Sequence, residues 1–302
     1  MATLREIRGR IVGFKSTAKI TQAMKMVAAA KLRRAQDNIK AARPYARALQ
    51  ELLTDLLHNS NLETATSPLL FGRTDLEPGT DRVLLIVVTS DRGLAGAFNS
   101  GLLRFTEHRV RERYQEHRKS GRLSLVTVGR RGTDYFSKRD FDIKGKYPGI
   151  FSRLDFVTAQ VIANEAVRLF TEGECDRVEI IFNEFKSVVS QKPVSNRLLP
   201  LLDEAERAEG GPQSALEYIY EPEPASILDV LVPKHLETTI WKSLLESNAA
   251  EQGARMTAMD AATRNARDLV NALQLSFNKA RQAAITKELL EIVSGAEALS
   301  KG

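Results

Sequence analysis

The sequence predicts an α/β protein in which long amino- and carboxy-terminal helices pair as an antiparallel coiled coil beside a central Rossmann-like domain with a mostly parallel sheet. Apolar residues recur at helical spacing near both ends of the chain, and short aliphatic runs alternate with helical patterns between them. The length of 302 residues suits one α/β domain with a helical appendage. We expect three segments: a coiled-coil helix at 1–60, an α/β domain at 80–204 and a second coiled-coil helix at 215–302.

The amino-terminal helix is predicted to begin at a capping box, because Thr3 and Glu6 have the spacing at which each side chain satisfies a backbone amide of the first turn. Apolar residues then follow mostly in steps of three and four, which places them on one helix face. We assign to this seam Leu4, Ile7, Ile11, Phe14, Ala18, Ile20, Met24, Val27, Leu32, Ala35, Ile39, Ala42, Ala46, Leu49, Leu53 and Leu56. The heptad spacing is typical of a coiled coil, and Pro44 is expected to kink or split the helix.

The carboxy-terminal segment offers a matching apolar stripe. Its positions are Ala266, Leu269, Val270, Leu273, Phe277, Ala280 and Ala284, followed by Ile285, Leu289, Ile292 and Val293. Between Pro233 and Leu299 the sequence has no further proline, which allows one long helix. Because a long helix pair that is otherwise polar outside is normally held by neighbouring chains, this pattern indicates part of a larger assembly.

The middle of the chain alternates strands and helices. Uninterrupted aliphatic runs predict buried strands at Val83–Val88, Leu123–Val128 and Val178–Phe182. Helices are predicted at about 99–118 and 154–170, so the crossovers make neighbouring strands parallel. Two further extended stretches, 185–189 and 197–202, precede a polar loop at 203–213.

Positive charge is concentrated on the first helix. The chain has a formal net charge of +6 and a pI near 9.4, and seven basic residues lie between Lys25 and Arg47 against one acid, Asp37. An acidic partner is expected, and nucleic acid, an anionic membrane and an acidic protein are all compatible with the charge. The alternatives are a solvated helix face and a nucleic-acid-binding or scaffold coiled coil, although this helix supplies only Tyr45 for base stacking.

Other sequence features restrict the location and the redox chemistry. No stretch approaches the roughly 20 apolar residues that a membrane span needs. The charged amino terminus is unlike a secretory signal or a transit peptide, so the chain is expected to be mature from Met1. A single cysteine, Cys175, excludes an internal disulfide and is expected to be a small buried side chain.

The turn at 90–99 is the candidate for ligand chemistry. Gly93 and Gly96 lie where a doubly wound fold would hold a phosphate, but the full dinucleotide spacing and the lysine-hydroxyl pair of a phosphate loop are missing. We interpret Asp91, Arg92, Gly93 and Gly96 as a structural turn. The four histidines lack metal-ligand spacing, and Ser90 has no histidine near it in the motif. We therefore expect no catalytic residue, cofactor or metal ion; a small α/β enzyme with helical dimerisation arms is the rival hypothesis.

Three long segments carry a family resemblance. They are ITQAMKMVAAAKLRRAQ at 20–36, TSDRGLAGAFN at 89–99 and FNKARQAAITKELLEIVSGAEAL at 277–299. In this order and spacing they resemble the gamma subunit of F-type ATP synthase, bacterial type, over essentially the whole chain. The resemblance implies a non-catalytic central rotor shaft. Such a shaft couples proton or other ion flow through the membrane sector to ATP synthesis and hydrolysis on the beta subunits, and it regulates ATPase activity.

The resemblance also implies partners and contact residues. The partners are the hexamer of alpha and beta subunits, the epsilon subunit and the c-ring, at the cytoplasmic face of the plasma membrane. Membrane contact is expected only through the complex, and nucleic acid is not expected as a partner. The residues that match hexamer-contacting segments are Met24, Lys25, Arg33, Arg34, Arg281, Gln282, Ile285, Leu289 and Ile292. Seam packing of Met24, a solvated Arg281 and intramolecular packing of Leu289 and Ile292 are the alternatives.

Two parts of the sequence depart from the family pattern. Ala95 and Ala97 stand where the central motif often has Cys and Gly, which should preserve a tight turn of small residues. Arg264 stands where acidic or lysine residues are common.

Overall fold

The chain divides into two compact units. The computed structural model describes residues 3–59, 68–73, 80–202, 221 and 223–300. One unit combines Met1–Ala28 with Met256–Gly302, and we call it the helical-pair unit; the other is Ala29–Arg255, the sheet unit. Two long helices, α1 (Leu4–Asn59) and α8 (Pro224–Ser300), contribute to both units. The expected division into segments 1–60, 80–204 and 215–302 stays a prediction.

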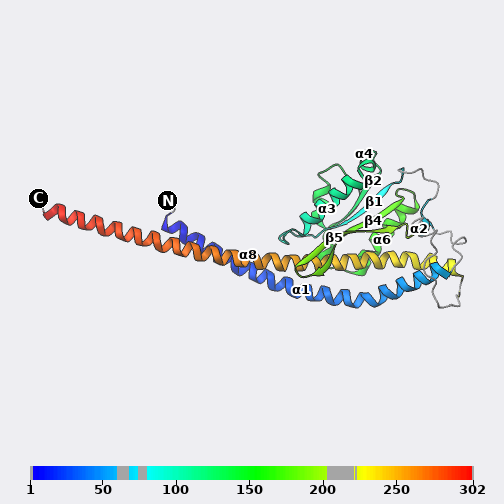
Figure 1. The fold of residues 1–302 in the computed structure, drawn as a ribbon, viewed down its shortest axis with the longest axis horizontal. Helices are drawn as coiled ribbons and strands as arrows, with labels where there is room; N and C mark the ends of the chain where they lie inside the picture. Colours follow the sequence, from blue (N-terminus) through cyan, green and yellow to red (C-terminus); the bar gives the residue numbers. More distant parts are fainter. Residues whose placement is uncertain (1–2, 60–67, 74–79, 203–220, 222, 301–302) are drawn as a thin grey trace. The chain divides into compact units, whose positions relative to one another are not determined.

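In the helical-pair unit, the first part of α1 lies antiparallel to the last part of α8 (Figure 1). The direction follows from the contacts, since Arg8 stacks over the Phe277 ring while Thr21 bonds to Thr263. The predicted capping box is confirmed: the Thr3 amide donates to Glu6 at 2.9 Å, and the Glu6 amide donates to the Thr3 hydroxyl at 3.3 Å.

The seam of α1 differs from the predicted one in its middle. Ile20 and Val27 are 60% and 56% exposed, so their assignment to the seam was wrong. Thr21 and Ala28 are buried instead, because they continue the three-and-four spacing from Ala18 to Leu32. Further along, most of the predicted seam positions are buried or half-buried, and α1 continues as one helix through Pro44, so a split there was also wrong.

The sheet unit contains five strands in the order β3-β2-β1-β4-β5. Strands β1 to β4 are parallel, and β5 is antiparallel to β4. The strands span Val83–Val88 (β1), Leu123–Val128 (β2), Asp142–Tyr147 (β3), Arg177–Ser187 (β4) and Ser190–Leu199 (β5). The predicted mostly parallel sheet is therefore confirmed.

Helices cover both faces of the sheet (Figure 1). Alternate residues of β1 point to opposite sides: Leu85 packs with residues of α3 and α5, and Ile86 packs with residues of α6 and α8. The covering elements are α2 (Pro68–Phe71), α3 (Phe98–Arg113), α4 (Gln115–Lys119), α5 (Arg130–Phe136), the short helix η2 (Ile150–Ser152) and α6 (Phe156–Thr171). The sheet core is thus closed on both sides, as parallel sheets require.

Several predicted elements have different bounds. The helix predicted at 99–118 is two helices, α3 and α4, separated at Tyr114. The stretch at 185–189 is not a separate strand but contains the end of β4 and the turn of a hairpin with β5, and β5 ends before 202. Strand β3 was not predicted. The polar loop predicted at 203–213 lies outside the described residues.

Candidate functional site

The basic stretch of α1 contains both paired and exposed side chains. In the helical-pair unit, Met24 is half-buried, and the Lys25 Nζ lies 2.5 Å from the Asp260 Oδ1. Asp260 also pairs with Arg264, which gives that residue a defined contact within α8. The hydrogen bond from Lys25 is the main cause that holds the pKa of Asp260 below its usual value. Lys25 is therefore already paired within the chain.

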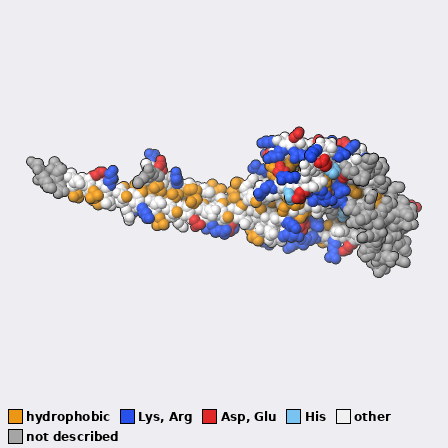
Figure 2. All heavy atoms as spheres, turned by 45° about the horizontal axis from the view of Figure 1, so that its top comes forward, with side chains coloured by type: hydrophobic (Ala, Val, Ile, Leu, Met, Phe, Trp, Pro, Cys, Tyr) orange, Lys and Arg blue, Asp and Glu red, His pale blue; other side chains and the backbone are white. Residues whose placement is uncertain are grey.

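Two other basic residues of α1 that we predicted to contact a partner are exposed and, within the described residues, not paired like Lys25. Arg33 and Arg34 belong to the sheet unit and are exposed. Lys and Arg side chains also gather on the visible surface of this unit around its sheet (Figure 2). The positive charge of the chain is thus distributed more widely than the first helix alone.

The carboxy-terminal part of α8 presents apolar side chains to solvent. Ile285, Leu289 and Ile292 are 49%, 57% and 67% exposed, and Arg281 and Gln282 are exposed as well. Hydrophobic side chains are visible along this part of the helix in Figure 2. The alternative in which Leu289 and Ile292 pack within the chain is wrong, since both side chains are more than half exposed.

The turn after β1 is organised around the Asp91 carboxylate. Its oxygens accept hydrogen bonds from three backbone amides, those of Arg130 at 2.9 Å, Gly149 at 2.6 Å and Phe151 at 3.0 Å. Asn99 closes the turn by accepting the Ser90 amide at 3.0 Å. Because one amide begins α5 and the other two belong to the turn of η2, Asp91 connects the end of β1 to both of these segments.

The same turn also docks on α8 within the sheet unit. Arg255 donates to the Gly93 carbonyl at 2.7 Å, and Ala95 packs with Ala250 and Ala254. Gly96 has a φ of +57°, the left-handed region that favours glycine. The packing against α8 explains the small side chain of Ala95, and a Cβ on Gly93 would lie 2.7 Å from a guanidinium nitrogen of Arg131. Arg92 is exposed.

A buried polar cluster joins β4 to α3 and to β5. Glu179 is 3% exposed and accepts hydrogen bonds from Tyr114, from Arg109 at 2.9 Å and from Ser195 at 2.8 Å. Burial alone would raise the pKa of Glu179, but these hydrogen bonds hold it below its usual value. Burial and the bond to Glu179 raise the pKa of Tyr114 to about 12. Every member has a structural partner, so we assign this cluster to stability.

The described part of the chain offers little redox or metal chemistry. Cys175 is buried, and burial raises the pKa of its thiol to about 12. Among the described residues, no group of three or more His, Cys, Asp or Glu side chains is placed to hold a metal ion.

The predicted site residues are divided between the two units. Lys25 and Ile285 belong to the helical-pair unit, whereas Arg33 and Asp91 belong to the sheet unit. Sequence reasoning missed Asp260 as a partner of Lys25 and Arg255 as a partner of the turn. The spacing of Glu251 and Arg255 by four residues favours the ion pair that they form within the helix, but no local pattern predicts the contact of Arg255 with Gly93.

Comparison with known proteins places the whole chain in one family. The family model described as ATP synthase matches residues 3–299. The ATP synthase gamma chain of Prosthecochloris aestuarii is 51% identical over 299 residues, which cover 99% of this chain and 99% of that protein. The ATP synthase gamma chain of Chlorobaculum tepidum is 48% identical over 301 residues and is covered completely, as is this chain.

Solved structures agree with this assignment. A chain of the central stalk and c-ring structure of Tetrahymena thermophila mitochondrial ATP synthase is 26% identical, with a TM-score of 0.57 over 80% of this chain and 99% of that chain. A chain of the Euglena gracilis mitochondrial ATP synthase shares the fold, with a TM-score of 0.68 at 18% identity, over 98% of this chain and 94% of that chain. Because the family model and the curated gamma chains match over essentially the full length, this chain belongs to the ATP synthase gamma chain family.

Proposed function

We propose that the exposed faces of α1 and α8 carry the contacts through which this gamma chain acts as the rotor of an F-type ATP synthase. As a gamma chain it is a non-catalytic subunit of the central stalk. It therefore influences ATP synthesis and hydrolysis on the beta subunits through protein contacts. Rotation changes the affinities of those sites only if the shaft contacts their conformational states differently.

The observation that carries this proposal is the apolar surface near the end of α8. Ile285, Leu289 and Ile292 expose about half or more of their side chains, although exposed apolar surface is unfavourable in water. Contiguous apolar surface on a protein marks a contact with a partner. An apolar sleeve formed by the alpha and beta subunits fits this chemistry.

The basic residues of α1 support a second contact. Arg33 and Arg34 are exposed, and Met24 and Lys25 are partly accessible about two to three turns earlier along α1. An acidic loop of a beta subunit would complement this charge and orient the shaft as it turns. Arg281 and Gln282, both exposed on α8, are proposed to contact a second loop of beta.

The proposed location of the chain in the cell depends on its assembly into the complex. No helix in the described part of the chain is long and apolar enough to cross a membrane. We propose that the gamma chain reaches the cytoplasmic face of a bacterial plasma membrane as a peripheral subunit, through contacts with the c-ring and epsilon.

Reconstitution tests this function directly. The full chain is mixed with the alpha and beta subunits of its own enzyme, and the products are separated by size-exclusion chromatography and assayed for ATP hydrolysis. We expect one complex of three alpha subunits, three beta subunits and one gamma chain, with ATPase activity that the gamma chain alone lacks. Failure of folded subunits to associate would contradict the proposal.

A further inference from the structure

The apolar contact between α1 and α8 is interrupted inside the sheet unit. On one side of the interruption, Leu32, Ala35 and Ile39 pack with Leu245 and Ala249. On the other side, Leu53 and Leu56 belong to the main core together with Leu228, Val232 and Leu236. Between these two clusters lies a cavity of about 840 Å³, which we call the interhelix cavity. Its volume is within the range of about 300–1,000 Å³ that is typical of small-molecule sites.

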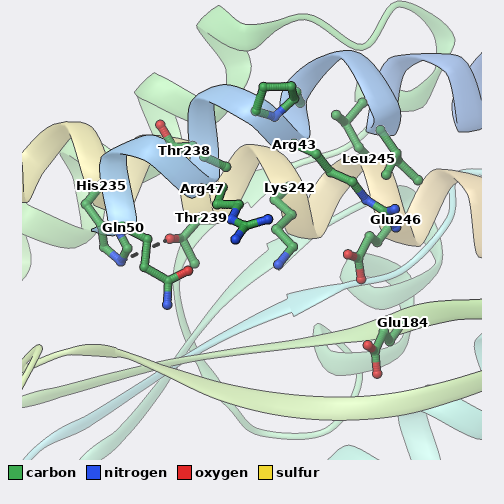
Figure 3. A pocket seen from close by; sticks show the side chains of 14 residues that line it. Arg43, Arg47, Gln50, Glu184, His235, Thr238, Thr239, Lys242, Leu245 and Glu246 are labelled. Atoms are coloured by element: carbon green, nitrogen blue, oxygen red, sulfur yellow. Dashed lines mark hydrogen bonds between the residues drawn. The ribbon is translucent and has the colours of Figure 1, made fainter. Parts of the chain in front are cut away.

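The interhelix cavity is lined by positively charged side chains from both helices. Arg43 and Arg47 come from α1, and Lys242 comes from α8. In Figure 3, Arg47 and Lys242 extend from their two helices into the same space. Among the described residues, no ion pair involves Arg43 or Lys242; Arg47 pairs with Glu51 at 2.7 Å, and both of these side chains are largely exposed. In the described part of the chain, Arg43 and Lys242 are thus free of close ion pairs, although the Glu246 carboxylate at the other end of the cavity attracts both of them.

Polar groups complete the lining. Thr238 is only 5% exposed, and its Oγ1 has no hydrogen-bond partner within the described residues. Gln50 and His235 lie toward the same end of the cavity, where His235 bonds to Thr239 at 3.4 Å (Figure 3). Burial lowers the pKa of His235, so the ring is neutral near pH 7 and able to donate or accept one hydrogen bond.

This arrangement is costly for a structural seam. A gap between packed helices loses van der Waals contacts, and a buried hydroxyl without a partner costs about 1–3 kcal/mol. The seam of α1 itself passes through Ala42, Ala46 and Leu49, which are half-buried, whereas Arg43, Arg47 and Lys242 are exposed beside it. A ligand that occupies the gap and bonds to these groups offsets both losses.

The charges indicate the class of ligand. Three cationic side chains face two carboxylates, those of Glu184 and Glu246, which lie toward the other end of the cavity (Figure 3). Arginine forks bind phosphate and carboxylate in a bidentate manner, and a lysine adds a compact point charge. A phosphate group, with up to two negative charges at neutral pH, matches several converging cations better than a single carboxylate.

We propose that the interhelix cavity binds a phosphate-bearing small molecule, with its phosphate group held by Arg43, Arg47 and Lys242. Gln50, Thr238 and His235 bond to the remainder of the molecule. The ligand class covers inorganic phosphate and small hydroxyl-rich phosphate esters. This site is separate from the rotor contacts proposed above, so its test does not depend on them.

Calorimetric titration of the full-length chain tests the proposal. Glycerol 3-phosphate and inorganic phosphate are the two probes, in about 0.1 M salt, with glycerol and sulfate titrated for comparison. We expect saturable binding of at least one phosphate compound and much weaker binding of glycerol and sulfate. Tighter binding of the ester by about tenfold would identify an ester site, whereas equal affinities would identify a site for inorganic phosphate.

Variants connect the binding to the cavity. Lys242→Met and Arg43→Gln should each weaken binding by about tenfold or more, through loss of a charge-assisted hydrogen bond. Thr238→Val, which keeps the side-chain volume, should weaken binding of the ester. Lys31→Gln, an exposed position on the same helix outside the cavity, is the matched control and should bind normally. Circular dichroism confirms that each variant is folded.

Three results would overturn the proposal. The first is no saturable heat with either phosphate compound up to roughly 20 mM, a concentration above any specific affinity expected of such a site. The second is binding that persists unchanged in both Lys242→Met and Arg43→Gln. The third is equal binding of sulfate and phosphate, which would show a general anion cleft.

Discussion

The ammonium group of Lys25 lies 2.5 Å from a carboxylate oxygen of Asp260, across the contact between α1 and α8 in the helical-pair unit. The carboxylate of Asp260 also pairs with Arg264 on its own helix. A residue proposed to face the beta subunits therefore also joins the two helices of its own chain. Substitution of Lys25 would change both interactions together, and an experiment has to separate them.

A charge exchange separates the two roles of Lys25. Lys25→Glu should lower the thermal midpoint of the isolated chain, because two carboxylates would then face each other, and should lower the ATPase rate of the complex. Adding Asp260→Lys should restore the thermal midpoint but not the ATPase rate, since the charge offered to a partner stays reversed. Recovery of both properties in the double variant would show that Lys25 acts only within the chain.

The acid sensitivity of this pair has a definite direction. Since the pKa of Asp260 is lowered in the folded chain, its contribution is complete above the ordinary carboxyl pKa of about 3.9 and is lost as the pH falls through the lower folded value. The difference in thermal midpoint between the wild type and Asp260→Asn should therefore shrink only under strongly acidic conditions.

Thr21 and Thr263 form a buried polar layer in the helical-pair unit. Their hydroxyl oxygens are 2.7 Å apart, and each also bonds to a carbonyl of its own helix. Thr21→Val should lower the free energy of unfolding by about 1 kcal/mol, because it leaves the other hydroxyl without its cross-helix partner. The double variant with Thr263→Val should cost less than the sum of the single changes. Strict additivity in denaturant unfolding would show that the cross-helix bond contributes nothing.

Glu179 is expected to be a major contributor to the stability of the sheet unit. Glu179→Gln removes the charge that Arg109 and Tyr114 satisfy and should lower the free energy of unfolding by about 3 kcal/mol in urea denaturation. Glu116→Gln on α4 is the matched control, because within the described residues the Glu116 side chain makes an exposed pair with Lys119, and its loss should change stability by less than about 0.5 kcal/mol.

Within the same cluster, the stability contributions of Glu179 and Tyr114 depend on pH in opposite directions. The lowered pKa of Glu179 means that its contribution is present above the ordinary glutamate pKa of about 4.3 and is lost as the pH falls below it. The contribution of neutral Tyr114 is present below about pH 10 and is lost as the pH rises through about 12. Ultraviolet titration of Tyr114→Phe should lack the tyrosine that ionises near pH 12 in the wild type.

Asp91 should matter to folding through its three amide partners. Asp91→Ala leaves those amides without their acceptor and should lower the free energy of unfolding by about 3 kcal/mol, measured by urea denaturation. Asp134→Ala, at an exposed position on α5, is the control and should be nearly neutral. If the two variants were equally stable, the hydrogen bonds that Asp91 accepts from the three amides would not contribute to stability.

The apolar surface near the end of α8 can be tested without truncating the helix. Leu289→Ser with Ile292→Ser should weaken assembly with the alpha and beta subunits, because apolar burial contributes about 1.5–3 kcal/mol for each fully covered side chain. The isolated chain should keep its helical signal, since both side chains are exposed in it. Normal assembly and torque would argue against an apolar sleeve around this segment. Deletion of 285–302 should have the stronger effect and leave the sheet unit folded.

Local patterns were sufficient where neighbouring residues determine the structure. The uninterrupted runs of β1 and β2 gave their bounds directly, and the capping box fixed the first turn of α1. Strand β3 was missed because it is at an edge and alternates exposed with half-buried residues, and Gly145 weakens its strand signal further.

Local sequence patterns could not predict contacts between residues that are far apart along the chain. The seam of α1 was misread at Ile20 and Val27 because apolar character was given more weight than spacing; Thr21 and Ala28 keep the heptad register. Asp91 could be assigned to a turn, but its acceptor role depends on amides that lie 39 to 60 residues away. Similarly, the residues that line the interhelix cavity come from two helices and lie nearly 200 positions apart in the sequence, so no local motif predicts the cavity.

The burial of Cys175 has a practical consequence for single-molecule work. Maleimide reagents react with the thiolate, and a buried thiol with a pKa of about 12 supplies almost none at neutral pH. The chain has one cysteine, so we expect the wild-type protein to be an unreactive background for labelling. A fluorophore or a bead can therefore be attached at a cysteine introduced on the surface, and its rotation followed, without first replacing the native residue.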